Sequence, residues 1–204
     1  VKTVAIPLCV DLERFMIRPK AERKFFTYSG SGAPWQNLPQ LSELWGELYK
    51  KDPSIRFRVI SRDKRAKILG KDLPEDVIEF VGTSNLDELA VLMSEAEVGF
   101  LVREDSMVNR VSFPTKLSEY LAIGAWVVVS DLDWQASDIL RKHKVGLLID
   151  PNASKESVAT QILEKRNYFN QIDILDQHLE NATHELSKGY WLEWGKKQLL
   201  EFLP

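Results

Sequence analysis

Lys116 and Glu119 stand three residues apart, directly after Pro114 and Thr115, in a segment with a helical pattern. Residues at this spacing share one face of a helix. Proline suits the first turn, where unpaired N–H groups and the positive end of the helix dipole favour an anion such as a diphosphate. A lysine is unfavourable in that turn unless an anion binds beside it. Glu119 could then accept two hydrogen bonds from a ribose diol, and an intrahelical salt bridge is the alternative for the pair.

A polar loop, residues 103–114, leads directly into this helix start. It is long for a connection between two apolar segments, and long loops of this kind often carry binding residues. We therefore expect the loop to contribute to the same site as Lys116.

A second loop contains two glycines, in residues 29–32 (SGSG). Glycine lets the backbone approach a ligand closely, and free amides in such a loop can face a phosphate. The loop matches neither the G-x-G-x-x-G fingerprint nor the Walker motif. A phosphate cradle and a plain turn both remain open for it.

Metal and acyl-transfer chemistry find no support in the sequence. The single cysteine, Cys9, allows no internal disulfide and favours a small buried hydrophobe. His143, His178 and His184 do not have the spacing of metal ligands. No G-x-S-x-G elbow occurs either. We therefore expect neither a metal site nor a cofactor.

The 204 residues are 44% hydrophobic and 28% charged, with a formal net charge of −3, which is typical of a folded globular domain. A nucleic-acid partner is disfavoured because such proteins are usually basic. No apolar run approaches the ~18 residues of a membrane span, and the N-terminus lacks the features of a signal peptide. The chain begins at Val1 rather than methionine, so we expect it to be part of a longer protein.

Strand and helix patterns alternate along the chain, which predicts an α/β fold: a single Rossmann-like, doubly wound parallel sheet of about six strands with a helical C-terminal tail. The expected strands are residues 24–28, 57–60, 77–81, 98–102, 126–129 and 145–149. Ligands bind such sheets at the carboxyl ends of the strands. The loops to consider are therefore residues 29–37, 61–64, 82–86, 103–114 and 130–134.

Helices are expected between these strands. An apolar stripe marks residues 38–48, a charged helix starts at Asp63, and Asn85 caps a helix that runs to Ala96. A further helix covers residues 116–123 and stops at Gly124. Another helix ends near Lys144, and only helical patterns follow Ser154.

Four segments together resemble a known family. Residues 112–130 (SFPTKLSEYLAIGAWVVVS) are similar to the donor-site signature P-x-K-x-x-E-Y-L-A-x-G of GT-B glycosyltransferases, in the retaining family 4 group. Residues 6–15 (IPLCVDLERF) resemble the segment at which the second domain of that family begins. The remaining matches are FVG with LDEL and AEVGFL, within residues 80–101, and VGLLIDP at residues 145–151. The matches occur in the order that the family has.

The resemblance implies roles for individual residues. Glu119 would bind the ribose hydroxyls of a nucleotide-sugar, and the amides of Pro114, Thr115 and Lys116 would cradle its diphosphate. Lys116 would also stabilise the charge on the departing diphosphate, which makes it the candidate catalytic group. The remaining candidate binding residues would lie against the diphosphate, the base or the sugar: Gly30, Ser31, Gly32, Gly82, Arg103, Asn109 and Ser112.

The sequence departs from the family pattern at three places. Val111 stands eight residues before Glu119, where many members have a second acid. The glycine loop has no cation and carries Trp35 instead, so Arg62 and Lys64, or Lys116, would supply the positive charge. Trp126 replaces the proline of the signature.

The tryptophans leave one question open. Trp35 and Trp134 fall in strand-end loops, where stacking on a ligand and packing in the core are both possible. Trp45 is expected in the core, and Trp191 and Trp194 are expected to pack within the C-terminal helices.

The resemblance further implies a donor that is a UDP-, GDP- or dTDP-linked sugar, used without a metal by a hexosyltransferase of polysaccharide biosynthesis. The acceptor would be a glycan or a lipid-linked saccharide. We expect an opening segment at 1–20, an α/β core at 21–152 and C-terminal helices at 153–204. The acceptor-binding domain would precede the chain, so the chain alone would be inactive.

The enzyme is expected in the cytoplasm, at the inner face of the membrane, with membrane contact through the missing domain. A non-catalytic nucleotide-binding domain of the same fold is the alternative. An NAD-type Rossmann domain is disfavoured because the G-x-G-x-x-G fingerprint is absent.

Overall fold

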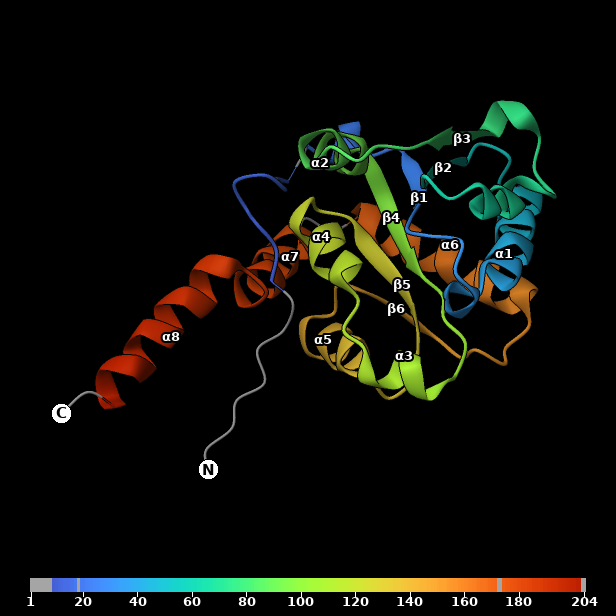
Figure 1. Ribbon diagram of the computed structural model, residues 1–204. Helices are drawn as coiled ribbons and strands as arrows, with labels where there is room; N and C mark the ends of the chain where they lie inside the picture. Colours follow the sequence, from blue (N-terminus) through green and yellow to red (C-terminus); the bar gives the residue numbers. More distant parts are fainter. Residues whose placement is uncertain (1–8, 18, 172–173, 203–204) are drawn as a thin grey trace.

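The computed structural model describes residues 9–17, 19–171 and 174–202. Its centre is a sheet of six parallel strands in the order β3-β2-β1-β4-β5-β6 (Figure 1). The strands are β1 (Phe25–Ser29), β2 (Arg56–Ile60), β3 (Ile78–Val81), β4 (Ala96–Leu101), β5 (Trp126–Ser130) and β6 (Gly146–Ile149). The expected α/β fold with a doubly wound parallel sheet is thereby confirmed.

The strands in the middle of the sheet are apolar on both faces because helices cover both. Every residue of β5 (WVVVS) is buried, and its valines are stiff β-branched residues that suit a pleated, covered strand. Registers such as Phe26 opposite Phe57 align β1 with β2. The carboxyl ends of these strands therefore meet at one edge of the sheet.

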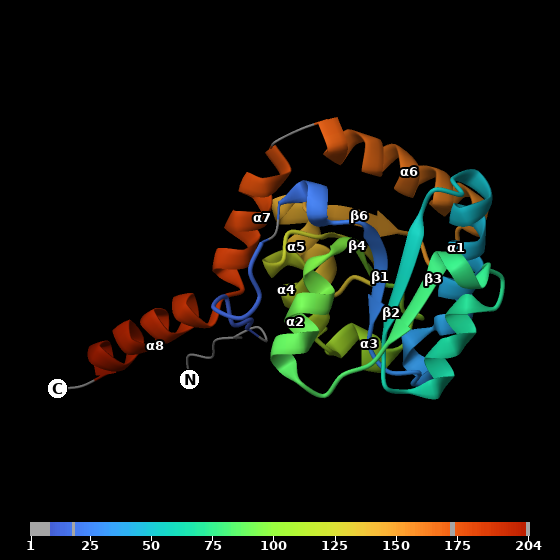
Figure 2. The ribbon, with the colours of Figure 1, turned by 90° about the horizontal axis from the view of Figure 1, so that it is seen from above.

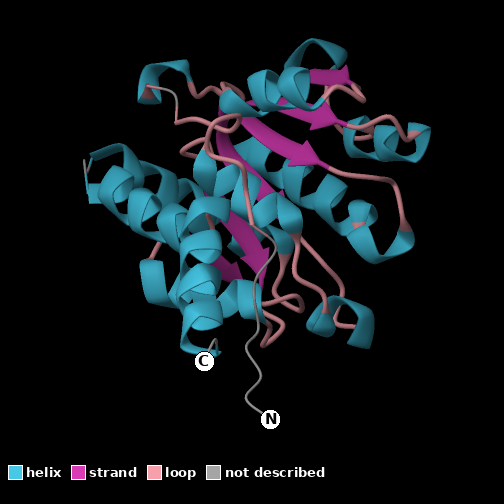
Figure 3. Cartoon of the chain, turned by 60° about the vertical axis from the view of Figure 1, so that its left-hand side comes forward, coloured by secondary structure: helices cyan, strands magenta, loops and turns pink. Residues whose placement is uncertain are grey.

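The helices form two layers (Figures 2 and 3). On one face, α1 (Leu38–Lys51) packs with α6 (Lys155–Gln171), and on the other face α4 (Thr115–Ala122) and α5 (Gln135–His143) pack with α7 (Ile174–Glu185). The helix α2 (Leu86–Ser94) links β3 to β4 across the sheet. Short helices complete the connections: η1 (Lys20–Glu22), η2 (Pro34–Gln36), η3 (Lys64–Gly70), η4 (Glu75–Val77) and α3 (Met107–Val111).

Four aromatic rings fill the space between α1 and the sheet. The Trp45 ring lies 4.8 Å from Phe57 and 5.7 Å from Phe100, and Phe26 lies 6.1 Å and 5.8 Å from the same two rings. All four side chains are fully buried. The expectation that Trp45 belongs to the core is confirmed. Aromatic pairs at these distances add about 0.5–1.5 kcal/mol each beyond the area that they bury.

Local sequence features define the ends of the helices. The Asn85 side chain accepts hydrogen bonds from the amides of Asp87 (2.8 Å) and Glu88 (3.3 Å), as a helix cap should. Gly124, at φ 88°, ends α4, and Lys144, at φ 57°, ends α5. The expected caps are thus confirmed, although α2 ends at Ser94 because Ala96 already pairs in β4.

The structure adds detail to two connections. The charged helix expected from Asp63 is present as the 3-10 helix η3, and Asp63 caps it by accepting from the Arg65 amide. The loop 103–114 is also not wholly irregular. Ser106 caps the short helix α3 within it by accepting from the amide of Asn109.

The C-terminal helix α8 (Lys188–Phe202) extends away from the sheet (Figure 1). The amide of Val10 donates to the carbonyl of Leu186 (2.9 Å), and the amide of Lys188 donates to the carbonyl of Val10 (3.1 Å). The opening segment is therefore fixed at the junction of α7 and α8. Residues 6–8 of the expected domain-start segment lie outside the described residues. Across the described part of the chain, no helix combines the length and the apolar character that crossing a bilayer requires.

Candidate functional site

A cavity of about 300 Å³ opens at the carboxyl ends of β1 and β2. The strand order reverses beside it, between β1 and β4, which is the usual ligand position in doubly wound sheets. The polar lining comes from the loops after β1, β2 and β3 and from the first turn of α4: Ser29, Gly30, Ser31, Ser61, Arg62, Asp63, Thr83 and Lys116. The fold therefore brings the glycine loop, the segment after β2 and the α4 start around one space.

The glycine loop passes very close to its neighbours. A Cβ atom at Gly30 would lie 2.7 Å from the Tyr28 hydroxyl oxygen, and one at Gly32 would lie 2.4 Å from the Cβ of Arg65. The Gly30 amide donates to the Ile60 carbonyl (3.1 Å), and the Gly32 amide donates to Oδ2 of Asp63 (2.9 Å). Both glycine amides are thus engaged within the protein, as is the Ser31 carbonyl, which accepts from the Tyr28 hydroxyl (2.6 Å), and Ser31 lines the cavity.

Asp63 is a residue that sequence reasoning did not single out for the site. It holds the loop after β1 against η3, through the Gly32 amide and the Arg65 side chain (2.6 Å to Nη2). Hydrogen bonds from the side chain and amide of Arg65 keep the pKa of the Asp63 carboxyl well below its usual range. The aspartate at the start of a charged helix was the available clue, because Asp is a preferred N-cap.

The first turn of α4 lacks a side-chain cap. Pro114 is the N-cap residue, and no side chain bonds to the first amides of the described helix. The Leu117 amide donates to the Pro114 carbonyl (2.9 Å), whereas the amides of Thr115 and Lys116 and the positive end of the helix dipole are available to an anion.

Lys116 and Glu119 form an ion pair on this turn, with Nζ 2.6 Å from Oε2. The lysine side chain is 25% exposed and the glutamate side chain 15%. The intrahelical salt bridge is therefore present in the protein, and Lys116 still lines the cavity. A bound anion could share or replace the glutamate as its partner.

Arg103 is buried behind the cavity, at 9% exposure. Its amide donates to Oγ of Ser130 (2.9 Å), and its Nη1 donates to Oδ1 of Asn109 (3.4 Å). Within the described residues its Nε atom has no hydrogen-bond partner. Burial lowers the pKa of the guanidinium, and the neighbouring Tyr28 partly offsets that effect.

Asn109 is fully buried and connects two loops. Its Nδ2 donates to the carbonyls of Glu104 (3.0 Å) and Trp35 (3.2 Å). Ser112 donates from Oγ to the Asn109 carbonyl (3.2 Å). Asn109 therefore joins the segment after β4 to the segment after β1, and it shapes the site from behind.

A second, smaller cavity of about 160 Å³ adjoins the first on the β3 side, and Arg62 and Gly82 line it. A Cβ at Gly82 would lie 2.8 Å from the Ser61 carbonyl oxygen, so the β2 and β3 ends touch there. Lys64 and Lys67 line the same space, and the Phe80 ring is half-exposed beside it. The predicted residues Arg62 and Gly82 thus lie together.

The two strand-end tryptophans differ. Trp134 is buried, and its indole N–H donates to the Ser130 carbonyl (3.0 Å), so it packs in the core. Trp35 is 47% exposed and remains available for stacking. In the part of the chain that the structure describes, no cluster of three His, Cys, Asp or Glu side chains could hold a metal ion.

The predicted residues divide into two groups. Gly30, Ser31, Arg62 and Lys116 line the main cavity. The others lie beside or behind it, namely Gly32, Gly82, Arg103, Asn109, Ser112, Pro114, Thr115 and Glu119. Arg103 and Asn109 do not line the cavity because their side chains are buried. A single sequence does not reveal which polar side chains are buried.

Comparison of the sequence with known protein families gives one match. Residues 10–167 match the family model described as glycosyl transferases group 1. None of the curated proteins matches the chain in sequence.

Similar solved structures include glycosyltransferases. Sucrose-phosphate synthase from Thermosynechococcus elongatus has a TM-score of 0.71 at 18% identity, covering 97% of this chain and 52% of that one. A glycosyltransferase from Rickettsia africae also has a TM-score of 0.71, at 16% identity, with coverage of 97% and 56%. A TarM mutant from S. aureus, in complex with Fondaparinux, alpha-GlcNAc-glycerol and UDP, has a TM-score of 0.64 at 19% identity, with coverage of 98% and 37%. The chain thus spans roughly a third to a half of the length of these proteins.

Proposed function

The chain belongs to the glycosyl transferases group 1 family, and we propose that it holds a nucleotide-diphospho-sugar for transfer to an acceptor. The observation that carries the proposal is the cavity in which Lys116 and the uncapped start of α4 face the glycine loop. A cation, free amides and a helix dipole converge there, which suits a diphosphate.

The proposed mechanism follows from charge. When the bond between sugar and phosphate breaks, negative charge grows on the diphosphate. The amides of Thr115 and Lys116, the α4 dipole and the Lys116 ammonium would stabilise that charge without a large rearrangement. Arg62, which makes no ion pair among the described residues, would supply a second cation.

Glu119 is the proposed ribose ligand. Its carboxylate lies one turn after Lys116 and is mostly buried, so it presents a fixed acceptor to a diol. The smaller cavity beside Gly82 would take the base, with Phe80 at its rim. A UDP, GDP or dTDP donor fits this arrangement, and the UDP bound to the TarM mutant supports the same class.

We further propose that the chain is the C-terminal, donor-binding half of a family 4-like enzyme. The partial coverage of the similar structures supports this, because each has a second part of comparable size. In this proposal residues 1–20 form the opening segment, 21–152 the core and 153–204 the C-terminal helices. The other half would bind a glycan or lipid-linked saccharide at the inner face of the membrane in the cytoplasm, and the isolated chain would be inactive as a hexosyltransferase.

Nucleotide-dependent stabilisation tests the donor site. UDP, GDP or dTDP at about ten times its Kd should raise the melting temperature by about 3–6 °C. Glu119→Ala should abolish the rise, whereas Glu43→Ala on the exposed side of α1 should keep it. If no nucleotide raises the melting temperature, the proposal fails, and a rise with NAD alone would favour an NAD-binding domain.

A non-catalytic domain of the same fold is the second candidate. It is favoured by Val111, which is exposed at the position of the family's second acid, and by the glycine loop without a cation. A sugar-transfer assay on the full-length protein separates the two candidates. Nucleotide binding without transfer would select the second.

A further inference from the structure

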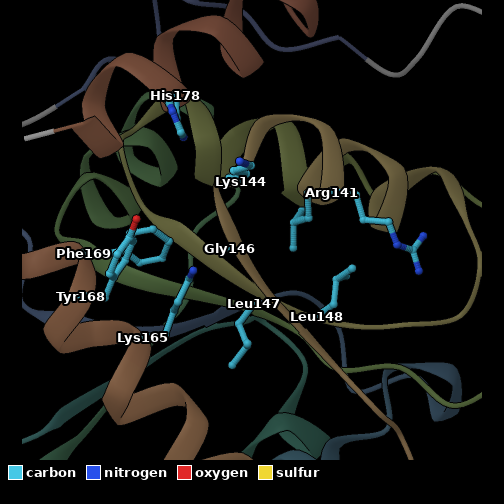
Figure 4. Close-up of a pocket in the computed structure, with 10 residues that line it drawn as sticks. Arg141, Lys144, Gly146, Leu147, Leu148, Lys165, Tyr168, Phe169 and His178 are labelled. Atoms are coloured by element: carbon cyan, nitrogen blue, oxygen red, sulfur yellow. The ribbon is translucent and has the colours of Figure 1, made fainter. Parts of the chain in front are cut away.

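A separate cavity lies at the far edge of the sheet, beside β6 (Figure 4). Its volume is about 260 Å³, and α5, β6, α6 and α7 enclose it. It shares no lining residue with the cavity at the carboxyl ends of β1 and β2.

The charges around this cavity have one sign. Lys144, Lys165 and His178 line it, together with Arg141, and none of the acidic side chains in the described ranges does. This is unusual in a chain whose net charge is −3. Arg141 is neutralised by Asp131, at 2.7 Å, and its guanidinium points away from the opening in Figure 4.

The other three basic groups are not neutralised in this way. Among the described residues, Lys144, Lys165 and His178 form no ion pair. In Figure 4 the ammonium end of Lys165 leaves α6 toward β6, and His178 extends from α7 on the other side of the opening. The ammonium groups of Lys144 and Lys165 therefore line the cavity without an acidic partner, which suits an anion.

The Lys165 ammonium lies against two aromatic rings. Its Nζ lies 4.8 Å from the ring centroid of Tyr168 and 4.7 Å from that of Phe169. The two rings hold the ammonium in place by cation–π attraction. Burial lowers the pKa of this ammonium, so a bound anion would also favour its charged form.

The floor of the cavity is apolar. Leu147 and Leu148, on the edge strand β6, are only half-buried and line it. The site thus combines a cationic rim with an apolar surface that a small hydrophobic group can cover. We propose that the β6 cavity binds a phosphate ester with a compact apolar substituent, its phosphate beside the ammonium groups of Lys144 and Lys165 and its apolar part against the half-buried edge of β6.

Phenyl phosphate is a suitable probe, followed by the backbone amide NMR signals of the protein. We expect saturable shifts at Gly146, Leu147 and Leu148 with a millimolar Kd, and weaker effects with inorganic phosphate or phenol alone. Shifts confined to residues 29–32, or no saturation at β6, would overturn the proposal.

Two variants test the cations. Lys165→Gln and Lys144→Asn should each raise the Kd for phenyl phosphate about tenfold, the loss expected for one charge-assisted contact. Asparagine tolerates the positive φ of position 144, so that variant should keep the α5 end folded. Lys165→Arg should restore binding, and Lys24→Gln, an exposed lysine elsewhere, should leave the Kd unchanged. A wild-type Kd in both test variants would refute the site.

The phosphate could come from a lipid or from a soluble ester. Flotation with phosphatidylcholine vesicles, with and without phosphatidic acid, distinguishes these sources. Binding to phosphatidic acid that is lost in Lys165→Gln and Lys144→Asn assigns a lipid headgroup. Phenyl phosphate binding without vesicle binding assigns a soluble ester.

Discussion

Lys116 stands between two partners, the carboxylate of Glu119 at 2.6 Å and the open cavity. Lys116→Gln should weaken binding of the preferred nucleoside diphosphate by about 10- to 100-fold, because hydrogen bonds to charged groups contribute roughly 1.5–3 kcal/mol. Titration calorimetry measures the change, and Lys116→Arg should retain most of the affinity. An unchanged Kd in Lys116→Gln would mean that the lysine serves the salt bridge alone.

Gly99 shows how closely one residue can fix a helix to the sheet. A Cβ there would lie 2.4 Å from Cγ of Tyr120, whose hydroxyl donates to the Thr27 carbonyl (3.1 Å). Gly99→Ala should therefore destabilise the protein by about 1–3 kcal/mol, as overpacking does. Gly189→Ala is the matched control, since nothing lies within 4 Å of its added Cβ. It should stabilise α8 slightly, and denaturant unfolding of both variants checks the contrast.

Only some residues of the candidate site could be predicted from the sequence. Lys116 and Glu119 were visible because their spacing after Pro114 is informative without a structure. The full burial of Asn109 could not be predicted from the sequence. Its hydrogen bonds to the Trp35 and Glu104 carbonyls form only when the loops after β1 and β4 pack together. Asp63 was missed as a site residue for the same reason: its partner Gly32 is 31 positions away.

Among the elements, α2 depends on a single cap. Asn85 accepts two amide hydrogen bonds at the start of a nine-residue helix that links β3 to β4. Asn85→Ala should lower the free energy of unfolding by about 1 kcal/mol, and Asn85→Asp should restore it. Equal stability of Asn85→Ala and the wild type in urea unfolding would contradict the role of the cap.

Elements were predictable where one residue pattern dominates. Residues 98–101 of β4 and residues 126–129 of β5 are apolar on both faces, which is typical of a sheet that helices cover on both sides. The expected helix after Asp63 is present, but its charged residues are compatible with both an α-helix and a 3-10 helix. The lengths of the neighbouring connections decide between them, and these depend on tertiary packing.

At the scale of the whole molecule, Glu185 joins α5 to the end of α7. Its Oε2 lies 2.6 Å from Nζ of Lys142 and 2.7 Å from Nε2 of His143. Burial favours a higher pKa for Glu185, but the hydrogen bonds from these two residues outweigh it and hold the pKa below the usual value.

The lowered pKa of Glu185 makes the contact between α5 and α7 sensitive to acid. A glutamate has a pKa of about 4.3 in an unfolded chain, and its folded value here is lower, so the stabilisation is present above that pH and is lost as the pH falls through the folded pKa. Glu185→Gln should therefore reduce the difference in unfolding free energy between neutral and acidic pH. Glu164→Gln, on the exposed side of α6, should leave the difference as in the wild type. If the free energy of unfolding varied with pH equally in all three proteins, Glu185 would not be the source of the acid sensitivity.

The bridge between Val10 and Ser187 has a mechanical consequence. Tension applied between Val10 and α8 is carried by two hydrogen bonds, from the amides of Val10 and Lys188, and by the exposed ion pair of Lys188 with Asp11. No strand of the sheet lies on the path of that force until the two bonds break. When the protein is pulled between these two segments, the hydrogen bonds of Val10 should therefore break first, while the six-stranded sheet stays folded.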